Sequence, residues 1–343
     1  MNAIELSFVI PVYNGAATIK RVVGEILANF AAHSLEVILV NDGSKDDTEG
    51  VCRGLVEAFP RTVIFLQLSR NFSEHNAVLA GLNCAQGKFT AILDDDGQNP
   101  PAEIIRLYEA IKIGGFDTVY GYYNQKRHHW FRNLGSRFND SVANIMLKKP
   151  KHIYLSSFKI MNRFAVDQVI TYKGAFPYID GLIFRVTQNI AQIPVEHVAR
   201  EQGTSGYTLQ KLVKLWLNMF LNFSISPLRV AALLGLFTSA ASVPLIFLVI
   251  IDKIMNPQLT MGVPSILVAM SFFSGIQLLI IGLVGEYLGR MFLDHSGTPQ
   301  YVIRYTYGSS SGAAEQLVRN PPPGADILQS TTTEREATQL ANI

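Results

Sequence analysis

Short apolar runs alternate with helical patterns along the first two hundred residues of the chain. Four runs are nearly continuous and rich in Val, Ile, Leu and Phe: residues 6–12, 36–41, 63–68 and 89–94. Runs of this length and composition are typical of strands buried on both faces, as in a parallel sheet. They predict the strands of one α/β domain.

Helical patterns separate these runs. From Ile19 to Phe30, apolar residues recur at i, i+3, i+4, i+7, i+8 and i+11, which places them on one helix face with Asn14 as the N-cap. Weaker helical patterns follow at residues 48–59 and 74–85. The β-α-β-α succession predicts a doubly wound, mostly parallel sheet with helices on both faces.

Two long apolar spans follow this domain. Residues 230–251 and 263–285 contain no charged side chain. As helices, each would cover roughly 33 Å, enough to cross a hydrocarbon core of about 30 Å. Lys and Arg flank the outer ends of the pair, so we expect a multi-pass protein of the inner (plasma) membrane with both termini and the α/β domain in the cytoplasm. A buried helical hairpin in a soluble core is the alternative.

The segment between the domain and the spans is amphipathic. Its polar residues form a narrow stripe at helical spacing: Lys211, Lys214, Asn218 and Asn222. Such a helix suits the membrane interface, although a core helix of the soluble domain would have the same pattern. The expected parts are an α/β domain at 1–206, an interfacial helix at 207–226, a transmembrane hairpin at 227–305 and a disordered tail at 306–343.

Composition supports this division. Charged residues make up 16% of the 343 residues, and only eight of them lie between 207 and 303. A soluble domain usually carries about 25%. The net charge of +2 gives no support for nucleic-acid binding. Two cysteines are too few for a disulfide framework, which favours a reducing compartment.

Polar residues with chemical potential follow three of the predicted strands. The segments are Pro11-Val12-Tyr13-Asn14, Asn41-Asp42-Gly43-Ser44 and Asp94-Asp95-Asp96. In a doubly wound sheet, ligands bind beyond the carboxyl ends of the strands, so we expect these segments to converge on one site.

The acidic segment suggests a metal site. Asp94 and Asp96 alternate just after a buried run, so both can ligate one hard cation, Mg²⁺ or Mn²⁺, together with phosphate oxygens. A solvated acidic turn is the alternative, but adjacent carboxylates repel each other unless a cation is present. Asp42 offers an acceptor for ribose hydroxyls or a base edge, whereas Ser44 and Asp46 could serve only as a turn and helix N-cap.

Cations gather in two later segments. Residues 126–163 hold nine Lys or Arg and one acid, which indicates a phosphate-handling surface or a face held against anionic lipid headgroups. Arg127, Arg132 and Arg137 are expected nearer the acidic site. Arg200 lies in a Gly- and Ser-containing loop before the amphipathic segment, where it could hold an acceptor phosphate.

Taken in order, these motifs resemble the polyprenyl-phosphate glycosyltransferases of glycosyltransferase family 2, which include dolichol-phosphate mannose synthase and the undecaprenyl-phosphate aminoarabinose transferase. The resemblance covers residues 5–305. Besides the three strand ends, it rests on Gln98-Asn99-Pro100-Pro101, Arg200-x-x-Gly203-x-Ser205-x-Tyr207 and Gly285-Glu286-Tyr287-x-Gly289-Arg290. It implies a GT-A fold and inverting transfer of a sugar from a nucleotide sugar, expected to be a UDP-sugar, to the phosphate of a membrane polyprenyl phosphate.

The resemblance also implies roles for individual residues. Those implied in catalysis are Asp94, Asp96 and Arg200, and those implied as metal ligands are Asp94, Asp96 and Gln98. The donor would contact Pro11, Tyr13, Asn14, Asp42, Ser44, Asp95 and Gln98. The acceptor phosphate would contact Arg127, Arg132, Arg137, Arg200 and Ser205. Asp180 is a further candidate acid.

Several positions depart from the family's pattern. Gly15 stands where an acid often follows Tyr-Asn, and Asn41 replaces an Asp. Gly206 stands where Lys is common, and residues 154–158 lack an acid that many members carry. These departures bear on acceptor geometry and sugar identity rather than on the class of reaction.

Two other functions stay open at this point. A family 2 transferase that builds a polysaccharide or glycolipid on a hydroxyl acceptor would need a catalytic base, and the Gln-x-x-Arg-Trp motif usual in processive synthases is absent. An inactive membrane scaffold would leave the Asp94-x-Asp96 pair unexplained. A homo-oligomer is compatible with the sequence.

Overall fold

The computed structural model describes residues 3–123, 153–196 and 263–308, together with scattered positions between 228 and 255. In chain order, its elements are β1 (Leu6–Val12), α1 (Ile19–Asn29), β2 (Leu35–Asn41), α2 (Thr48–Ala58), β3 (Val63–Leu68), α3 (Glu74–Cys84), β4 (Phe89–Ile92), α4 (Glu103–Gly114), β5 (Thr118–Tyr123), β6 (Lys159–Asn162), α6 (Arg163–Val169), α7 (Ile179–Val186), β7 (Ile190–Val195), α10 (Val263–His295) and β8 (Ile303–Tyr307).

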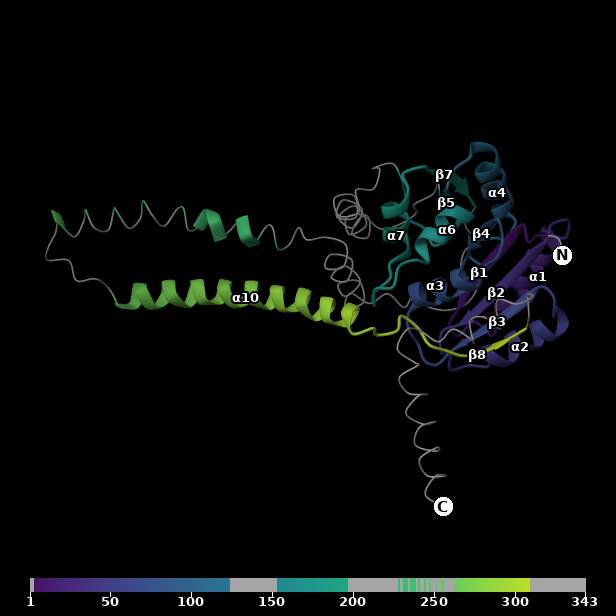
Figure 1. The fold of residues 1–343 in the computed structure, drawn as a ribbon, viewed down its shortest axis with the longest axis horizontal. Coiled ribbons are helices and arrows are strands. Elements are labelled where there is room, and N and C mark those ends of the chain that lie inside the picture. The colour runs from purple at the N-terminus through teal and green to yellow at the C-terminus, as the bar shows by residue number, and fades with distance from the viewer. Residues whose placement is uncertain are drawn as a thin grey trace, which may run out of the picture. The chain divides into compact units, whose positions relative to one another are not determined.

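The described strands form one eight-stranded sheet in the order β7-β5-β6-β4-β1-β2-β3-β8 (Figure 1). Strands β4, β1, β2 and β3 run parallel to one another at its centre. Strand β6 is antiparallel to β4 and β5, and β8 is antiparallel to β3. The four predicted strands and the mostly parallel sheet are confirmed, except that β4 ends at Ile92, two residues before the expected end.

Helices cover both faces of the sheet. Side chains of β1 alternate between them, and Leu6, Phe8 and Ile10 join a core with α1, α2 and α4. Val9 faces α3 on the other side, where Gly81 allows close approach because a Cβ atom there would overlap Val9 Cγ1. The predicted doubly wound α/β arrangement is therefore confirmed.

One predicted helix cap is wrong. Helix α1 begins at Ile19, its N-cap residue is Thr18, and the backbone N–H of Ile19 donates to the carbonyl of Gly15. Asn14 lies too early in the chain to cap this helix, and its side chain contacts the loop after β2 instead.

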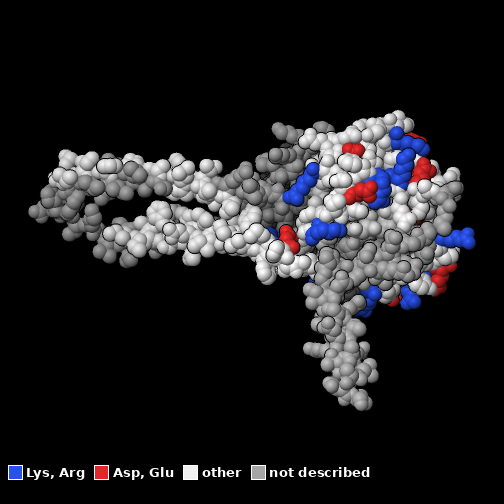
Figure 2. All heavy atoms as spheres, viewed as in Figure 1, with Lys and Arg blue, Asp and Glu red and all other residues white. Residues whose placement is uncertain are grey.

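The chain divides into two compact units, residues 1–206 with 297–343, and residues 207–296. Within the second unit, the Phe272–His295 stretch of α10 is long and apolar enough to cross a membrane, by length and composition, and is the single such helix in the described part of the chain. Figure 2 shows that α10 presents an uncharged surface along most of its length. The expected span at 230–251 lies largely outside the described residues, and the expected interfacial helix at 207–226 lies wholly outside them.

Strand β8 was not expected from the sequence. We expected the hairpin to reach residue 305 and a disordered tail to start at 306, but Ile303–Tyr307 pairs with β3 at the sheet edge. Tyr305 packs against Phe65 with ring centroids 6.2 Å apart, and Tyr307 contacts the same core. The strand signal here is only five residues long, an alternation of Ile303, Tyr305 and Tyr307. It lies close to the long apolar stretch and is much weaker than that pattern.

Candidate functional site

The polar ends of β1, β2 and β4 meet at the carboxyl edge of the sheet. After β1, the backbone N–H of Tyr13 donates to Asp95 Oδ2 over 3.0 Å, which joins it to the segment after β4. The next residue, Asn14, donates its backbone N–H to Ser44 Oγ over 2.9 Å, which joins it to the segment after β2. The predicted convergence of the three segments is confirmed.

Ser44 and Asn14 hold two of these segments together. Ser44 Oγ donates to Asn41 Oδ1 over 2.6 Å while accepting from Asn14, and Asn14 Oδ1 accepts from the backbone N–H of Lys45 over 2.8 Å. Asn14 adopts the left-handed conformation with φ of 55°, which Asn tolerates better than most residues. Asn41, one of the departures from the family's pattern, is therefore the anchor of Ser44, and its amide donates to Gln67 Oε1 over 2.8 Å.

Gly15 gives Asp95 the space that it occupies. A Cβ atom at Gly15 would overlap Asp95 Oδ2 and would lie 2.8 Å from Val12 Cγ1. Burial raises the pKa of Asp95 to about 7, and the adjacent charges of Asp94 and Asp96 act in the same direction. Asp95 therefore links two strand ends, and a side chain at residue 15 is incompatible with that link.

Asp94 and Asp96 flank this link on either side. Asp94 Oδ2 accepts from Ser157 Oγ over 2.6 Å, and Asp96 Oδ1 accepts from the backbone N–H of Gln98 over 3.0 Å. Gly97, between Asp96 and Gln98, has φ of 70°, a turn conformation that favours glycine. Gln98, expected to offer its side chain to a metal, contacts Asp96 here through its backbone.

The arrangement fits a divalent cation that is shared with a substrate. Among the described residues no group of three or more His, Cys, Asp or Glu side chains converges. Asp94 and Asp96 supply oxygen ligands at alternate positions of one turn. Mg²⁺ is commonly bound in this way, by one or two carboxylates and the phosphates of a substrate.

Asp42 is held by a loop that was not predicted from the sequence. The backbone N–H of Phe72 donates to Asp42 Oδ1 over 2.6 Å, and Asn71 Nδ2 donates to the Asp42 carbonyl over 3.1 Å. Gly43, with φ of 68°, allows this approach because a Cβ atom there would lie 2.6 Å from Asn71 N. Burial raises the pKa of Asp42 to about 6. Residues 69–73 follow β3, so the polar residues after this fourth strand are the sequence signal from which the contact could have been predicted.

A buried ionic cluster lies next to the acidic turn. Lys159 is 3% exposed, and its Nζ forms an ion pair with Asp180 Oδ1. Tyr120 donates its hydroxyl to the same oxygen over 2.9 Å. Lys159 was counted in the basic stretch at 126–163, but it is an interior residue with an interior partner, and Asp180 is that partner.

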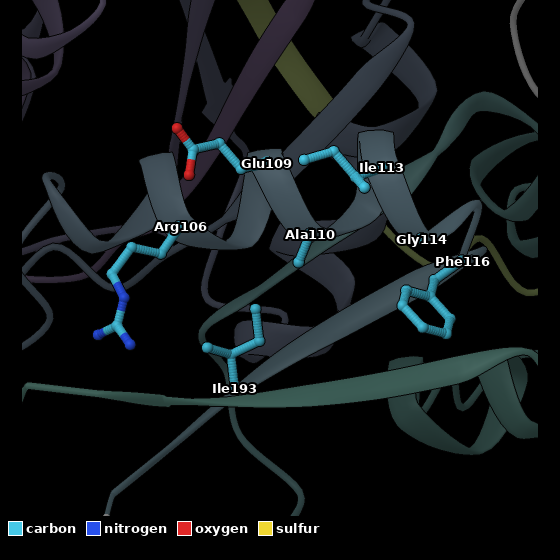
Figure 3. Close-up of a pocket in the computed structure, with 7 residues that line it drawn as sticks. All are labelled: Arg106, Glu109, Ala110, Ile113, Gly114, Phe116 and Ile193. Carbon is cyan, nitrogen blue, oxygen red and sulfur yellow. The ribbon is translucent and has the colours of Figure 1, made fainter.

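Five predicted residues lie outside the described part of the chain: Arg127, Arg132, Arg137, Arg200 and Ser205. Their roles on the acceptor side stay predictions. A hollow of about 440 Å³ lies elsewhere, between α4 and β7, with Ile113, Phe116 and Ile193 in its wall (Figure 3). It contains none of the predicted site residues.

Comparisons with known proteins identify the family of the chain. The family described as glycosyl transferase family 2 matches residues 7–170. The uncharacterized glycosyltransferase YkcC of Bacillus subtilis (strain 168) is 31% identical, over 89% of this chain and 95% of its own. The undecaprenyl-phosphate 4-deoxy-4-formamido-L-arabinose transferase of Serratia proteamaculans (strain 568) is 30% identical, over 89% of this chain and 94% of its own.

The similarity to solved structures is more distant. The crystal structure of mannosyl-3-phosphoglycerate synthase from Rubrobacter xylanophilus aligns with a TM-score of 0.45 at 17% identity, covering 63% of this chain and 71% of that chain. The relatives that align over most of the chain therefore decide its family.

Proposed function

The chain belongs to glycosyltransferase family 2 and is a glycosyltransferase, and on this premise we propose that it transfers a sugar from a nucleotide sugar to the phosphate of a membrane polyprenyl phosphate, with inversion. The observation that carries the proposal is that the segments holding Asp42 and Asp94–Asp96 are both joined to the end of β1 at one edge of the sheet, in a chain that also contains α10. The sheet edge would take the water-soluble donor, and α10 would keep the catalyst at the lipid acceptor.

The donor half of the proposal uses Asp42 and the acidic turn. Asp42 would accept hydrogen bonds from the nucleoside, which we infer to be uridine, and the donor would also contact Pro11, Tyr13, Asn14 and Ser44. Asp95 would keep the diphosphate side of the site joined to the end of β1. The proposed fold is GT-A.

Asp94 and Asp96 would hold Mg²⁺ or Mn²⁺, with Gln98 fixing Asp96 through its backbone N–H. When bound, such an ion stabilises the negative charge of a departing nucleoside diphosphate. The chain's own contribution is to present the two carboxylates on a turn whose geometry depends on Gly97 and on the contact of Asp95 with Tyr13.

The acceptor half draws on the relatives, several of which are named as undecaprenyl-phosphate transferases. A phosphate monoester has a second pKa near 6, so it is already a dianionic nucleophile at pH 7 and needs no strong general base. The proposed acceptor contacts are Arg127, Arg132, Arg137, Arg200 and Ser205. The proposed location is the inner membrane, with the sheet domain and both termini in the cytoplasm.

Membranes that contain the full chain test this proposal. They would be incubated with labelled nucleotide sugars, Mn²⁺ and undecaprenyl phosphate, and the lipid product would then be treated with mild acid. A labelled lipid that releases its sugar under mild acid supports transfer to phosphate. An acid-stable lipid indicates a hydroxyl acceptor, and an absence of product across donors indicates an inactive scaffold, so either result would overturn the proposal.

A further inference from the structure

Ser157 contacts Asp94 because of how the strands are paired. In the antiparallel pair of β4 with β6, Ile92 lies opposite Lys159. Continued two residues beyond the end of β4, the same register brings Asp94 opposite Ser157, and Ser157 Oγ does donate to Asp94 Oδ2 over 2.6 Å. The sheet itself therefore sets this contact.

The backbone that carries Ser157 is anchored on both sides. The carbonyl of Phe158 accepts from the backbone N–H of Gly121 over 2.9 Å, and the Phe158 side chain is fully buried. Lys159, two residues beyond Ser157, is fixed by its ion pair with Asp180. Ser156 Oγ accepts from the backbone N–H of Phe158 over 3.2 Å, which orders the preceding turn.

Two neutral groups donate to Asp94 Oδ2, Ser157 Oγ over 2.6 Å and Asn99 Nδ2 over 3.4 Å, whereas Lys159 forms its ion pair with Asp180. A hydroxyl orients a carboxylate without adding positive charge beside it. An ammonium in the same place would compensate the charge that attracts a metal ion. The last torsion of an Asp side chain is broad, so a hydrogen bond to one oxygen narrows the range of carboxylate orientations.

We propose that Ser157 is a positioning residue for Asp94, holding its carboxylate in the orientation that binds the divalent cation. This inference rests on the proposed function, because it takes Asp94 as a metal ligand. Partners of metal ligands, when removed, typically lower metal affinity by roughly 10–100-fold. The hydroxyl of Ser157 is such a partner.

The test measures Mn²⁺ binding by the full chain in detergent, from the electron paramagnetic resonance signal of free Mn²⁺, with UDP present. Ser157→Ala is expected to weaken Mn²⁺ binding by roughly tenfold. Ser157→Thr keeps a hydroxyl and is expected to bind within about threefold of wild type. Ser34→Ala removes an exposed hydroxyl just before β2, at the opposite edge of the sheet, and serves as the matched control, with unchanged affinity expected.

A second readout separates positioning from folding. In the transfer assay, Ser157→Ala is expected to raise the Mn²⁺ concentration for half-maximal rate by a factor similar to its loss of affinity, while the rate at saturating Mn²⁺ recovers most of the wild-type value. Its melting temperature is expected to match that of Ser34→Ala. A purely structural role would lower the melting temperature and leave the Mn²⁺ dependence in place.

Asp94→Asn distinguishes the two ways of failing. If Asp94→Asn loses Mn²⁺ while Ser157→Ala binds it like wild type, the positioning role is refuted and the proposed function stands. A Ser157→Thr variant that behaves like Ser157→Ala also refutes it. If the wild-type chain binds no Mn²⁺, the metal assignment of the proposed function fails together with the inference.

Discussion

Both edges of the central sheet carry acidic residues, but the pKa of the acid is lowered at the amino edge and raised at the carboxyl edge. At the amino edge, just before β1, Glu5 lies 2.9 Å from His33 Nδ1 and 3.5 Å from Lys112 Nζ, and it accepts from the Tyr108 hydroxyl. The hydrogen bonds from His33 and Tyr108 lower the pKa of Glu5 to about 2. At the carboxyl edge, burial raises the pKa of Asp42 to about 6 and that of Asp95 to about 7.

The two edges differ in the groups that donate hydrogen bonds to these acids. Cationic and phenolic side chains surround Glu5, so its charge is compensated and contributes to stability. Asp42 and Asp95 accept from the backbone N–H groups of Phe72 and Tyr13, which orient a carboxylate without adding a positive charge. Acids whose charged form is disfavoured by their surroundings are typical of a binding site. Acids that are paired with cations are typical of a structural region.

The sharpest test of this difference is Asp96→Ala, which should reduce sugar transfer without reducing the stability of the fold. Loss of one of two carboxylate ligands is expected to reduce sugar transfer by a factor of roughly 10² or more, because the charge of the leaving diphosphate is no longer stabilised. Asp47→Ala is the matched control at the same edge, since Asp47 is exposed and its side chain makes no cap hydrogen bond. Product formation by mass spectrometry is the readout, and a wild-type rate for Asp96→Ala would contradict the metal assignment.

Asp42→Asn should increase the stability of the protein near neutral pH and remove the part of its pH dependence that comes from Asp42. The pKa of Asp42 is raised from 3.8 to about 6, so the native state binds the extra proton. The stability linked to this group is full below about pH 4 and is lost as the pH rises through about 6, a change of about 3 kcal/mol at most. Asp42→Asn is therefore expected to be more stable than wild type at pH 7.5 and similar at pH 4, while losing donor binding.

Denaturant unfolding across this pH range measures the effect. A wild-type stability that rises from pH 4 to pH 7 in the same way as that of Asp42→Asn would mean that Asp42 is not held in a disfavoured charge state.

Gly15→Ala should damage the carboxyl edge by crowding. Its Cβ would overlap Asp95 Oδ2, so either Asp95 leaves the Tyr13 N–H or the turn shifts, at a cost of about 2 kcal/mol. Gly24→Ala in α1 is the control, because nothing lies within 4 Å of a Cβ atom there and Ala is the better helix former. The expected result is lower stability and transfer for Gly15→Ala and slightly higher stability for Gly24→Ala, measured by thermal unfolding and product formation.

Gly15 also illustrates what could be predicted from the sequence. The strand runs, the helix faces and the meeting of three polar strand ends follow from residue periodicity and from the geometry of a parallel sheet, and all of these are confirmed. Gly15 itself was recognised only as a departure from the family's pattern. Glycine is needed at this position because a Cβ atom would overlap Asp95, eighty residues later in the chain. No local sequence pattern encodes that contact.

The contacts that could not be predicted from the sequence are of the same long-range kind. Ser157 meets Asp94 through the register of an antiparallel pair, and Phe72 meets Asp42 through a loop from a neighbouring strand. Strand β8 pairs with β3 across more than two hundred residues of chain. Strand pairing and register decide these neighbours, and neither can be deduced from single-strand periodicity.

The smallest expected effect comes from the amino edge. Glu5→Gln removes a compensated charge, whose folded pKa of about 2 lies below its ordinary value of 4.5. Stability from this group is therefore present above about pH 4.5 and is lost as the pH falls toward 2. Because the Glu5 side chain is 32% exposed, solvent screening reduces its contribution to about 1 kcal/mol. Glu5→Gln is expected to lose this amount at pH 7, to match wild type near pH 2 and to transfer sugar at the wild-type rate. If transfer falls while stability is unchanged, the amino edge also takes part in function, and the contrast between the two edges fails.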